Sequence, residues 1–365
     1  MKKFLGFVIL FFLGFCPAIA DEIKVLPSQL GVVEKIDYVD TDNELSQVKQ
    51  IVEIKLLSGN YKGQKALVDN VLTGNPYYDI KLKKNTKVLL HVEEQDGNLD
   101  VSISDIYRSN VLIALSILFC AVLIYVGRKK GFYSLVSIAI TCVLIVNFLS
   151  PMILAGINPI IATILICLLS TAVTMYLVGG FNRKSTSAAL GCMLSLLFAG
   201  LLSMLTVKFA NLTGFTSEHS MFLYSAHPEL NFVAISVSTM ILATLGAVMD
   251  IAMSIASTIN EIHTVDATKT VRELFSSGMN VGRDIIGTMA NTLILVYLGA
   301  SLPLLLLASN IDLMKFINLN QVVTEVASAL IGSIAIVICV PITAIVASEL
   351  IKNIPAKTEF IDSKD

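Results

Sequence analysis

From residue 109 to residue 347 the chain consists of long apolar stretches separated by polar breaks. A helix needs about 20 apolar residues to cross the hydrocarbon core of a bilayer, and these stretches have that length. This pattern predicts an α-helical, polytopic membrane protein. About seven transmembrane helices are expected, at residues 109–127, 132–150, 159–178, 186–206, 231–257, 285–308 and 323–347.

The composition agrees with this class. Hydrophobic residues make up 55% of the chain and charged residues 15%, whereas soluble globular domains carry about 25% charged residues. The deficit of charge begins after residue 100, since the first part of the chain is ordinarily polar. The net charge of -2 argues against a nucleic-acid partner.

Residues 1–20 resemble a secretory signal peptide. Lys2 and Lys3 form a basic end, residues 4–15 form an apolar run too short to span a membrane comfortably, and Ala18-Ile19-Ala20 fits a cleavage site. A retained signal anchor is the alternative to cleavage.

Residues 21–106 form a separate polar domain in which apolar and polar residues alternate. Alternation with a period of two is typical of half-buried strands. Five short strands suggest a small extracytoplasmic all-β domain, an OB-like barrel. The strands are expected at 30–39, 48–57, 64–71, 86–94 and 99–106. The domain has no cysteine, which excludes a disulfide framework there. Tyr77 and Tyr78 are interpreted as ordinary loop and core residues, with a binding groove as the alternative.

The orientation follows from basic residues near the span ends, which favour the cytoplasmic side. With the β domain outside, the outer loops hold only Lys208 and Lys315. The inner loops and the tail at 351–365 hold Arg128, Lys129, Lys130, Arg183, Lys184, Lys269, Arg272, Arg283, Lys352, Lys357 and Lys364. We therefore expect a multi-pass cell-membrane protein whose helical domain covers 107–350 and whose carboxyl terminus is cytoplasmic.

The fifth predicted span carries a stripe of small and polar residues. They recur at steps of three and four and so share one helix face: Thr239, Ala243, Gly246, Asp250, Ser254, Ser257 and Glu261. Inserting an acid near the middle of a membrane helix costs about 2.5 to 3.5 kcal/mol, unless it is protonated, paired or in contact with water. Asp250, with Ser254, is therefore a candidate ion- or proton-binding residue. The alternative is a packing residue hydrogen-bonded to a neighbour.

The sixth predicted span offers a partner for Asp250. Asn291, with Thr292 beside it, is expected to hydrogen-bond Asp250 across the interface between the two helices. Arg283 and Asp284 open this span at its cytoplasmic boundary. They are interpreted as interfacial anchors, and a salt-bridge gate with Asp250 or Glu261 is the alternative.

Glycines accompany both spans. Gly278 and Gly282 form a GxxxG pattern, which permits close approach of helix backbones, and Gly246 and Gly287 are expected to serve packing in the same way. The chain contains no P-loop, H-E-x-x-H or G-x-S-x-G motif, and its acidic and histidine residues have no compact metal-site spacing. We therefore expect no enzyme activity, cofactor or metal.

Two blocks, GAVMDIAMSIAST and ELFSSGMNVGRDIIGTMANTLILVYLGASLPLLLL, resemble the YibE/F-like family of bacterial membrane proteins. The resemblance covers about residues 110–350 and is strongest from 245 to 307. The amino-terminal domain also resembles the one that accompanies these spans in Gram-positive members. The resemblance implies a multi-span membrane protein of a kind often described as a permease or efflux component. It implies no particular substrate and no catalytic residues.

Two functions are favoured by these features, and a third, an intramembrane enzyme, ranks last because no motif supports it. The first is a transporter or permease component with an ion- or proton-linked site on spans five and six. The second is a non-transporting scaffold or sensor whose β domain binds an envelope ligand or a partner protein. Besides the lipid bilayer, a second copy of the chain or another membrane protein is an open partner in both.

Overall fold

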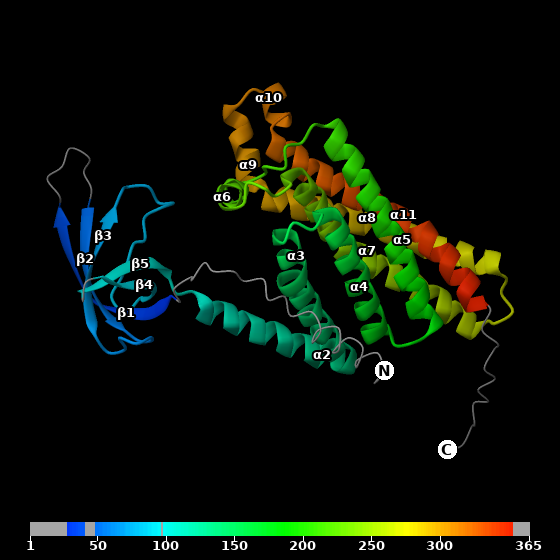
Figure 1. Cartoon of the computed structure of the whole chain (residues 1–365). Helices are drawn as coiled ribbons and strands as arrows, with labels where there is room; N and C mark the ends of the chain where they lie inside the picture. The colour runs from blue at the N-terminus through cyan, green and yellow to red at the C-terminus, as the bar shows by residue number, and fades with distance from the viewer. Residues whose placement is uncertain (1–27, 41–47, 96–97, 353–365) are drawn as a thin grey trace, which may run out of the picture. The chain divides into compact units, whose positions relative to one another are not determined.

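The computed structural model describes residues 28–40, 48–95 and 98–352 (Figure 1). The predicted signal peptide, the tail beyond residue 352, and residues 41–47 and 96–97 lie outside these ranges. The described chain divides into two compact units, one ending at Leu123 and the other beginning at Ile124. Each unit is described by itself below.

The first unit contains a nearly closed antiparallel barrel of five strands in the order β3-β2-β1-β4-β5. The strands are β1 (Gln29–Asp40), β2 (Val48–Leu56), β3 (Lys65–Leu72), β4 (Lys87–Gln95) and β5 (Asn98–Ile106). Each lies within two residues of its predicted position. Period two predicts these strands well because the alternation is imposed by burial of one face.

Alternate residues of the strands fill the interior of the barrel. Val33, Val52, Ile54, Val88 and Leu90 are completely buried there. The register of β1 against β2 shifts between Val33 and Lys35, and that of β4 against β5 shifts between Leu89 and Leu90. Bulges of this kind increase the local twist of a sheet, which helps five short strands to curl toward closure.

In the described chain, six helical stretches are long and apolar enough to span a membrane. The first is a continuous stretch made of α2 (Ser109–Leu144), the π-helical turn η1 (Ile145–Leu149) and α3 (Ser150–Leu154). The others are α4 (Pro159–Gly179), α5 (Arg183–Phe209), α7 (Phe232–Val265), α8 (Val271–Ala300) and α11 (Asn320–Lys352).

The described chain thus contains six membrane-length helical stretches where about seven spans were expected. The first two predicted spans, 109–127 and 132–150, lie in the one stretch from Ser109 to Leu154, in which Arg128 forms a kink with φ 48° and ψ −129°. The polar break expected at 258–284 is also largely helical, because α7 continues to Val265 and α8 begins at Val271.

Asparagine and threonine side chains begin several of these helices. The Oδ1 atoms of Asn158, Asn182 and Asn231 accept hydrogen bonds from backbone N–H groups in the first turns of α4, α5 and α7. Thr270 and Glu273 form a capping box at the start of α8, with Thr270 N donating to Glu273 Oε2 at 2.8 Å. Such caps satisfy amide groups that have no partner within the helix.

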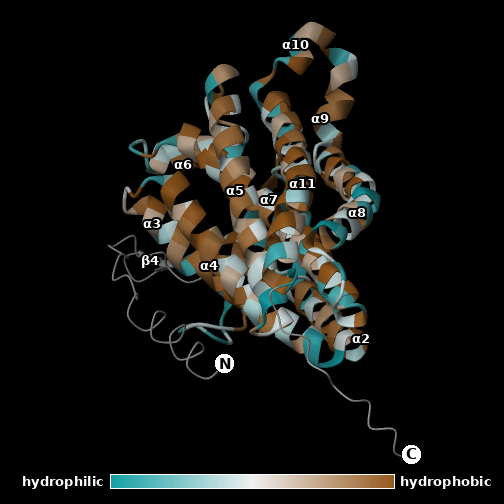
Figure 2. Ribbon diagram, turned by 90° about the vertical axis from the view of Figure 1, so that its right-hand side faces the viewer, coloured by the Kyte–Doolittle hydropathy of each residue, from teal (hydrophilic) through white to brown (hydrophobic). Residues whose placement is uncertain are grey.

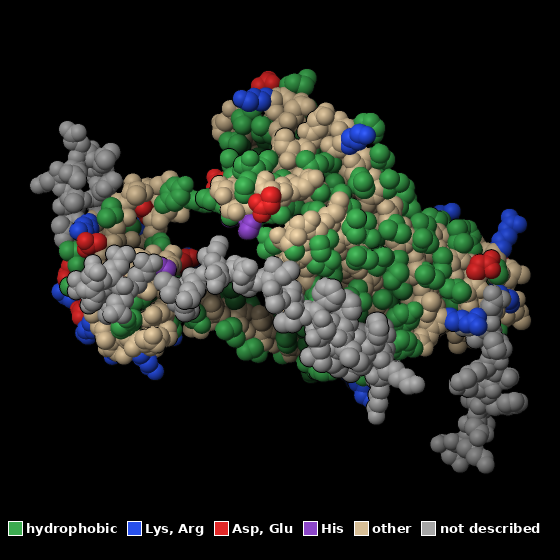
Figure 3. Space-filling view, in the orientation of Figure 1, with side chains coloured by type: hydrophobic (Ala, Val, Ile, Leu, Met, Phe, Trp, Pro, Cys, Tyr) green, Lys and Arg blue, Asp and Glu red, His purple; other side chains and the backbone are tan. Residues whose placement is uncertain are grey.

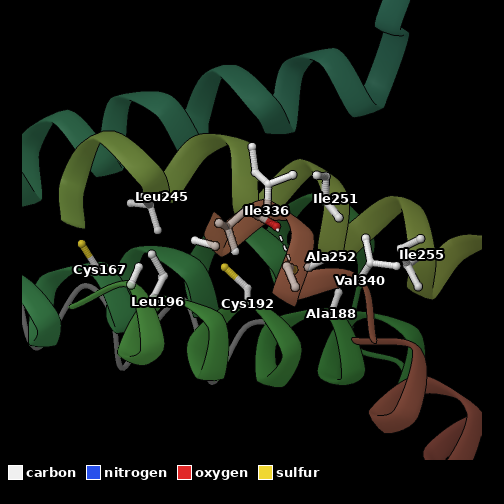
Figure 4. Close-up of a cluster of buried hydrophobic side chains, with 14 of the residues drawn as sticks. Cys167, Ala188, Cys192, Leu196, Leu245, Ile251, Ala252, Ile255, Ile336 and Val340 are labelled. Atoms are coloured by element: carbon white, nitrogen blue, oxygen red, sulfur yellow. Dashed lines mark hydrogen bonds between the residues drawn. The ribbon is translucent and has the colours of Figure 1, made fainter. Parts of the chain in front are cut away.

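The core of the second unit lies between α4, α5, α7 and α11 (Figure 4). Ala188 and Cys192 of α5, Ile251 of α7 and Ile336 of α11 are among its completely buried side chains. Small residues allow the helix axes to approach closely. α11 contacts α5, α7 and α8 and continues as a helix through Pro341.

Short helices join the long ones: α6 (Glu218–Ala226), α9 (Leu302–Leu307), the 3-10 turn η2 (Ala308–Asn310) and α10 (Leu313–Ile317). The long helices are predominantly apolar along their length (Figure 2). Figure 3 shows hydrophobic side chains over most of the visible surface of the helical unit, with Lys and Arg toward the helix ends. This distribution is that of a multi-pass membrane protein.

Candidate functional site

The polar stripe of α7 lies on the outside of the helical unit. Gly246, Asp250, Ser254 and Glu261 are all exposed, and Asp250 stands near the middle of the helix. The opposite face of α7 carries the apolar residues of the core. The sequence therefore predicted correctly that these residues share a face, and the structure turns that face away from the bundle.

α8 carries a second outward polar stripe. Asp284, Gly287, Thr288, Asn291 and Thr292 are all exposed. α8 is the least apolar of the six membrane-length stretches, and hydrophilic residues are visible along it in Figure 2. The two stripes belong to helices that are in contact with each other.

Two glycines bring α8 close to its neighbours. A Cβ atom at Gly278 would lie 2.7 Å from Ile259 Cδ1, and one at Gly282 would lie 3.1 Å from Ile255 Cδ1. A step of four residues forward along α8, from Gly278 to Gly282, thus corresponds to a step of four residues back along α7, from Ile259 to Ile255. The two helices therefore run antiparallel. Continuing this register places Gly287 at the height of Asp250.

Gly246 and Gly287 differ from that pair. A Cβ atom at either position would meet no atom within 4 Å. Gly278 and Gly282 therefore serve close packing within the chain, whereas Gly246 and Gly287 do not. Gly246 leaves open space at the height of Asn291 on α8, and Gly287 leaves open space at the height of Asp250 on α7.

Hydroxyl groups along the stripes donate to their own helices. Ser254 Oγ donates to the backbone oxygen of Asp250 at 2.8 Å, and Thr292 Oγ1 donates to that of Thr288 at 2.8 Å. Thr288 Oγ1 likewise donates to Ile285 O at 2.9 Å. A hydroxyl whose proton is engaged in this way offers only its lone pairs to a further group. Together with the Asp250 carboxylate, the stripes therefore present oxygen acceptors, which suit a cation or a proton donor.

The interactions expected between the two stripes are not formed. In the described structure Asp250 and Asn291 make no hydrogen bond, so the expected pairing is corrected. Arg283 donates to Asn280 Oδ1 at 3.0 Å, and over the same residues it makes no ion pair with Asp250, Asp284 or Glu261. The reason is that α7 and α8 meet through apolar residues and glycines, which turns the polar residues outward.

A second carboxylate, Glu325, lies in a position that the sequence did not single out. It is half-buried and lines a pocket of about 200 Å³ between α8, α9 and α11. From the sequence alone it lies near the start of the predicted span 323–347, where it is interpreted as a solvated residue at a helix end. The available signal was its spacing from Val322 and Ala329, which also line the pocket and lie on the same face of α11.

Over the described ranges, no three His, Cys, Asp or Glu side chains gather closely enough to hold a metal ion. In the loop before α7, His227 Nδ1 lies 3.1 Å from Glu229 Oε1. A hydrogen bond from its own backbone N–H, followed by the contact with His227, lowers the pKa of Glu229 below its ordinary value of 4.5.

Family comparisons cover both units. Residues 115–353 match the family model described as YibE/F-like protein, and residues 28–106 match the YibE/F family N-terminal domain. Comparisons with curated proteins and with solved structures gave no match.

Proposed function

Since this chain belongs to the YibE/F-like family of proteins, we propose that it is a transport-type membrane protein with an ion- or proton-linked site on the polar stripes of α7 and α8. Asp250 is the carboxylate that takes up the cation or proton. Ser254 on α7, and Asn291 and Thr292 on α8, offer further polar groups along the same two stripes. We assign the chain no enzymatic reaction.

The observation that carries this proposal is the environment of Asp250. It stands near the middle of a membrane-length helix, it is exposed on the unit, and no described side chain pairs with it. A charged carboxylate facing lipid would cost about 2.5 to 3.5 kcal/mol on insertion scales. Asp250 must therefore be protonated, bind a cation, face water, or face another protein. Protonation, cation binding and contact with water are the properties that a coupling site requires.

The stripes need a cover that separates them from lipid. Gly246 and Gly287 have open space in front of them, and small residues are frequent where membrane helices from different chains approach. A second copy of this chain or another membrane protein on this side would enclose a polar passage past Asp250. Arg283, Asp284 and Glu261, the candidates for an interface or a gate, would lie toward the cytoplasmic end of the same passage.

The proposed topology has the β domain outside and the carboxyl terminus inside. The stretch from Ser109 to Leu154 is 46 residues long, whereas about 20 residues cross a bilayer. Two crossings joined at the Arg128 kink, beside Lys129 and Lys130, fit this length and place three basic residues in the cytoplasm. The barrel's strand order, with β3 approaching β5, supports the OB-like assignment, and the proposed topology puts this domain on the outer side.

The test is proton flux in proteoliposomes under an imposed pH gradient, with and without candidate substrate cations. We expect Asp250→Asn to insert normally and to lower coupled flux at least about tenfold, because amides do not titrate. Asp312→Asn is a matched control, since Asp312 caps α10 through Lys315 N and asparagine caps as well as aspartate. Full flux in Asp250→Asn would reject the site.

One observation favours the second function, a scaffold or sensor. Tyr77 and Tyr78 are 71% and 70% exposed on the barrel unit. Their rings are arranged edge to face, with ring centroids 4.8 Å apart. Exposed aromatic pairs are frequent at interaction sites. Deletion of residues 21–105 separates the two functions: a scaffold or sensor should lose its activity entirely, whereas a transporter should retain part of its flux.

A further inference from the structure

The loop between β3 and β4, residues 73–86, is held together by its own hydrogen bonds. The Asp79 carboxylate accepts hydrogen bonds from Thr73 N at 2.6 Å, from Thr73 Oγ1 at 2.9 Å and from Gly74 N at 2.8 Å. These bonds close the first part of the loop into a compact turn. The loop therefore has a defined backbone conformation that does not depend on the side chains at its tip.

Tyr77 and Tyr78 project from this turn, and both rings are largely exposed. Asn75 Oδ1 accepts a hydrogen bond from Tyr77 N at 3.0 Å, which fixes the backbone that carries the rings. Tyrosine has an apolar ring and a polar hydroxyl, and it is enriched where the hydrocarbon of a bilayer meets water. A preformed loop also loses little conformational freedom when it docks.

The second part of the same loop is basic. Lys81, Lys83 and Lys84 are exposed, and the exposed Lys87 follows at the start of β4. From residue 73 to residue 87 the sequence contains one acid, Asp79, and the loop itself engages that carboxylate. The loop thus combines two exposed aromatic rings with an excess of positive charge, which complements an anionic surface.

The loop ends where the chain leaves the barrel for α2. Tyr107 N donates to Lys87 O at 2.9 Å, so the residue after β5 is bonded to the residue that follows the loop. Only Tyr107 and Arg108 separate β5 from Ser109, which begins the first membrane-length stretch. Two residues span at most about 7 Å, so this end of the barrel is tethered close to the bilayer.

We propose that the β3–β4 loop docks on the surface of the bilayer that anchors the protein. The two tyrosine rings lie at the level of the lipid headgroups, and the lysines of the loop lie beside the phosphates of anionic lipids. The partner is thus a lipid surface with a net negative charge. This role goes beyond the coupling site at Asp250, and its test measures no transport.

The chain contains no tryptophan, so one introduced tryptophan reports on its own surroundings. Tyr78→Trp places this reporter on the loop. Leu67→Trp is the matched control, because Leu67 is 75% exposed and lies on β3 about 17 Å before the strand ends at Leu72. Each full-length variant is placed in nanodiscs of phosphatidylglycerol or phosphatidylcholine whose acyl chains carry bromine near the headgroup end, since bromine quenches tryptophan fluorescence on close approach.

In phosphatidylglycerol we expect bromine to quench Tyr78→Trp at least about threefold more strongly than Leu67→Trp. A lysine near an anionic surface favours the docked state by about fivefold. Exchange of Lys81, Lys83 and Lys84 together for glutamine in the Tyr78→Trp protein should therefore lower its quenching to the level measured in phosphatidylcholine.

Equal quenching of the two tryptophan variants in phosphatidylglycerol would overturn the proposal. Quenching that is reduced neither by the lysine exchange nor by phosphatidylcholine would overturn it as well. Protection of the Tyr78→Trp fluorophore from aqueous acrylamide, without quenching by bromine, would show instead that the loop contacts protein. Unchanged circular dichroism and thermal unfolding would show that each variant is folded, as expected because all the exchanged side chains are exposed.

Discussion

Two helices of this protein carry stripes of small and polar residues with the same spacing, and the structure treats them oppositely. On α5 the stripe consists of Gly191, Ser195, Ala199 and Ser203, and all four residues are buried. On α7 the stripe that contains Gly246, Asp250 and Ser254 is exposed. The pattern along the sequence indicates a special face in both cases, but it does not indicate what covers that face.

The local chemistry of the two stripes is also alike. Ser195 Oγ donates to Gly191 O at 2.7 Å, just as Ser254 Oγ donates to Asp250 O at 2.8 Å. The differences are the acid on α7 and the neighbour on α5, where a Cβ atom at Gly191 would lie 2.9 Å from the Cα of Thr343. A covered stripe with no charge serves packing, whereas an uncovered stripe with a carboxylate is available for another group.

The largest effect that separates the two stripes is expected from glycine substitution. Gly191→Leu should destabilise the protein by about 1–3 kcal/mol or prevent folding, because the added atoms overlap Thr343 of α11. Gly246→Leu should leave the stability of the monomer unchanged, because a Cβ atom there meets nothing. Thermal unfolding in detergent, together with the yield of monodisperse protein, measures both. Equal losses in the two variants would show that the stripes do not differ.

A smaller and reciprocal effect is expected from the serines. Ser254→Ala should lower coupled flux in proteoliposomes by about threefold, which corresponds to about 0.6 kcal/mol, with no change in thermal stability. Ser195→Ala should leave the flux unchanged and lower stability by a similar amount, because its hydroxyl is buried. A loss of flux in the Ser195 variant instead would assign function to the buried stripe.

The smallest effect concerns acids that have partners, in contrast to Asp250. On the barrel, Lys65 Nζ lies 2.6 Å from Glu34 Oε2 and 3.0 Å from Glu53 Oε1. The hydrogen bond from Lys65 lowers the pKa of Glu34 below its ordinary value of 4.5. This pair therefore stabilises the barrel above pH 4.5, and its contribution is lost as the pH falls through the lowered pKa.

Hydrogen exchange of the strand amides in the full-length protein, corrected for intrinsic exchange rates, measures this contribution between about pH 3 and pH 7. Glu34→Gln should remove part of the pH dependence and change little else, since the group is solvent-exposed. An unchanged pH profile in the variant would show that the pair contributes nothing to barrel stability.

Sequence reasoning predicted the regular parts of the fold because their periods are imposed by local burial. The alternation in β2 and β4 and the shared face of Asp250 and Ser254 are of this kind. The Asp250–Asn291 pairing was wrong because helical spacing does not specify which faces of two neighbouring helices meet. Gly278 and Gly282 decide that in the structure, by bringing α8 against Ile259 and Ile255.

Glu325 was overlooked for a different reason. The pocket that it lines is formed by residues distant in sequence, among them Tyr297 before the break at Ser301 and Leu305 after it. No periodicity relates these residues to one another, so their proximity emerges only once α8, α9 and α11 are packed together.

Considered as an elastic rod, α11 has one point at which it bends most easily. Pro341 has no backbone N–H and removes one rung from the hydrogen-bond ladder, so the helix resists bending least at that point. On the amino-terminal side of Pro341, Val326 and its neighbours form a wall of the pocket. On either side of Pro341, Val340 packs against Gly282 of α8 and Ala344 packs against Gly278. A shift of the pocket wall should therefore bend α11 near Pro341, at the level where α8 packs against it.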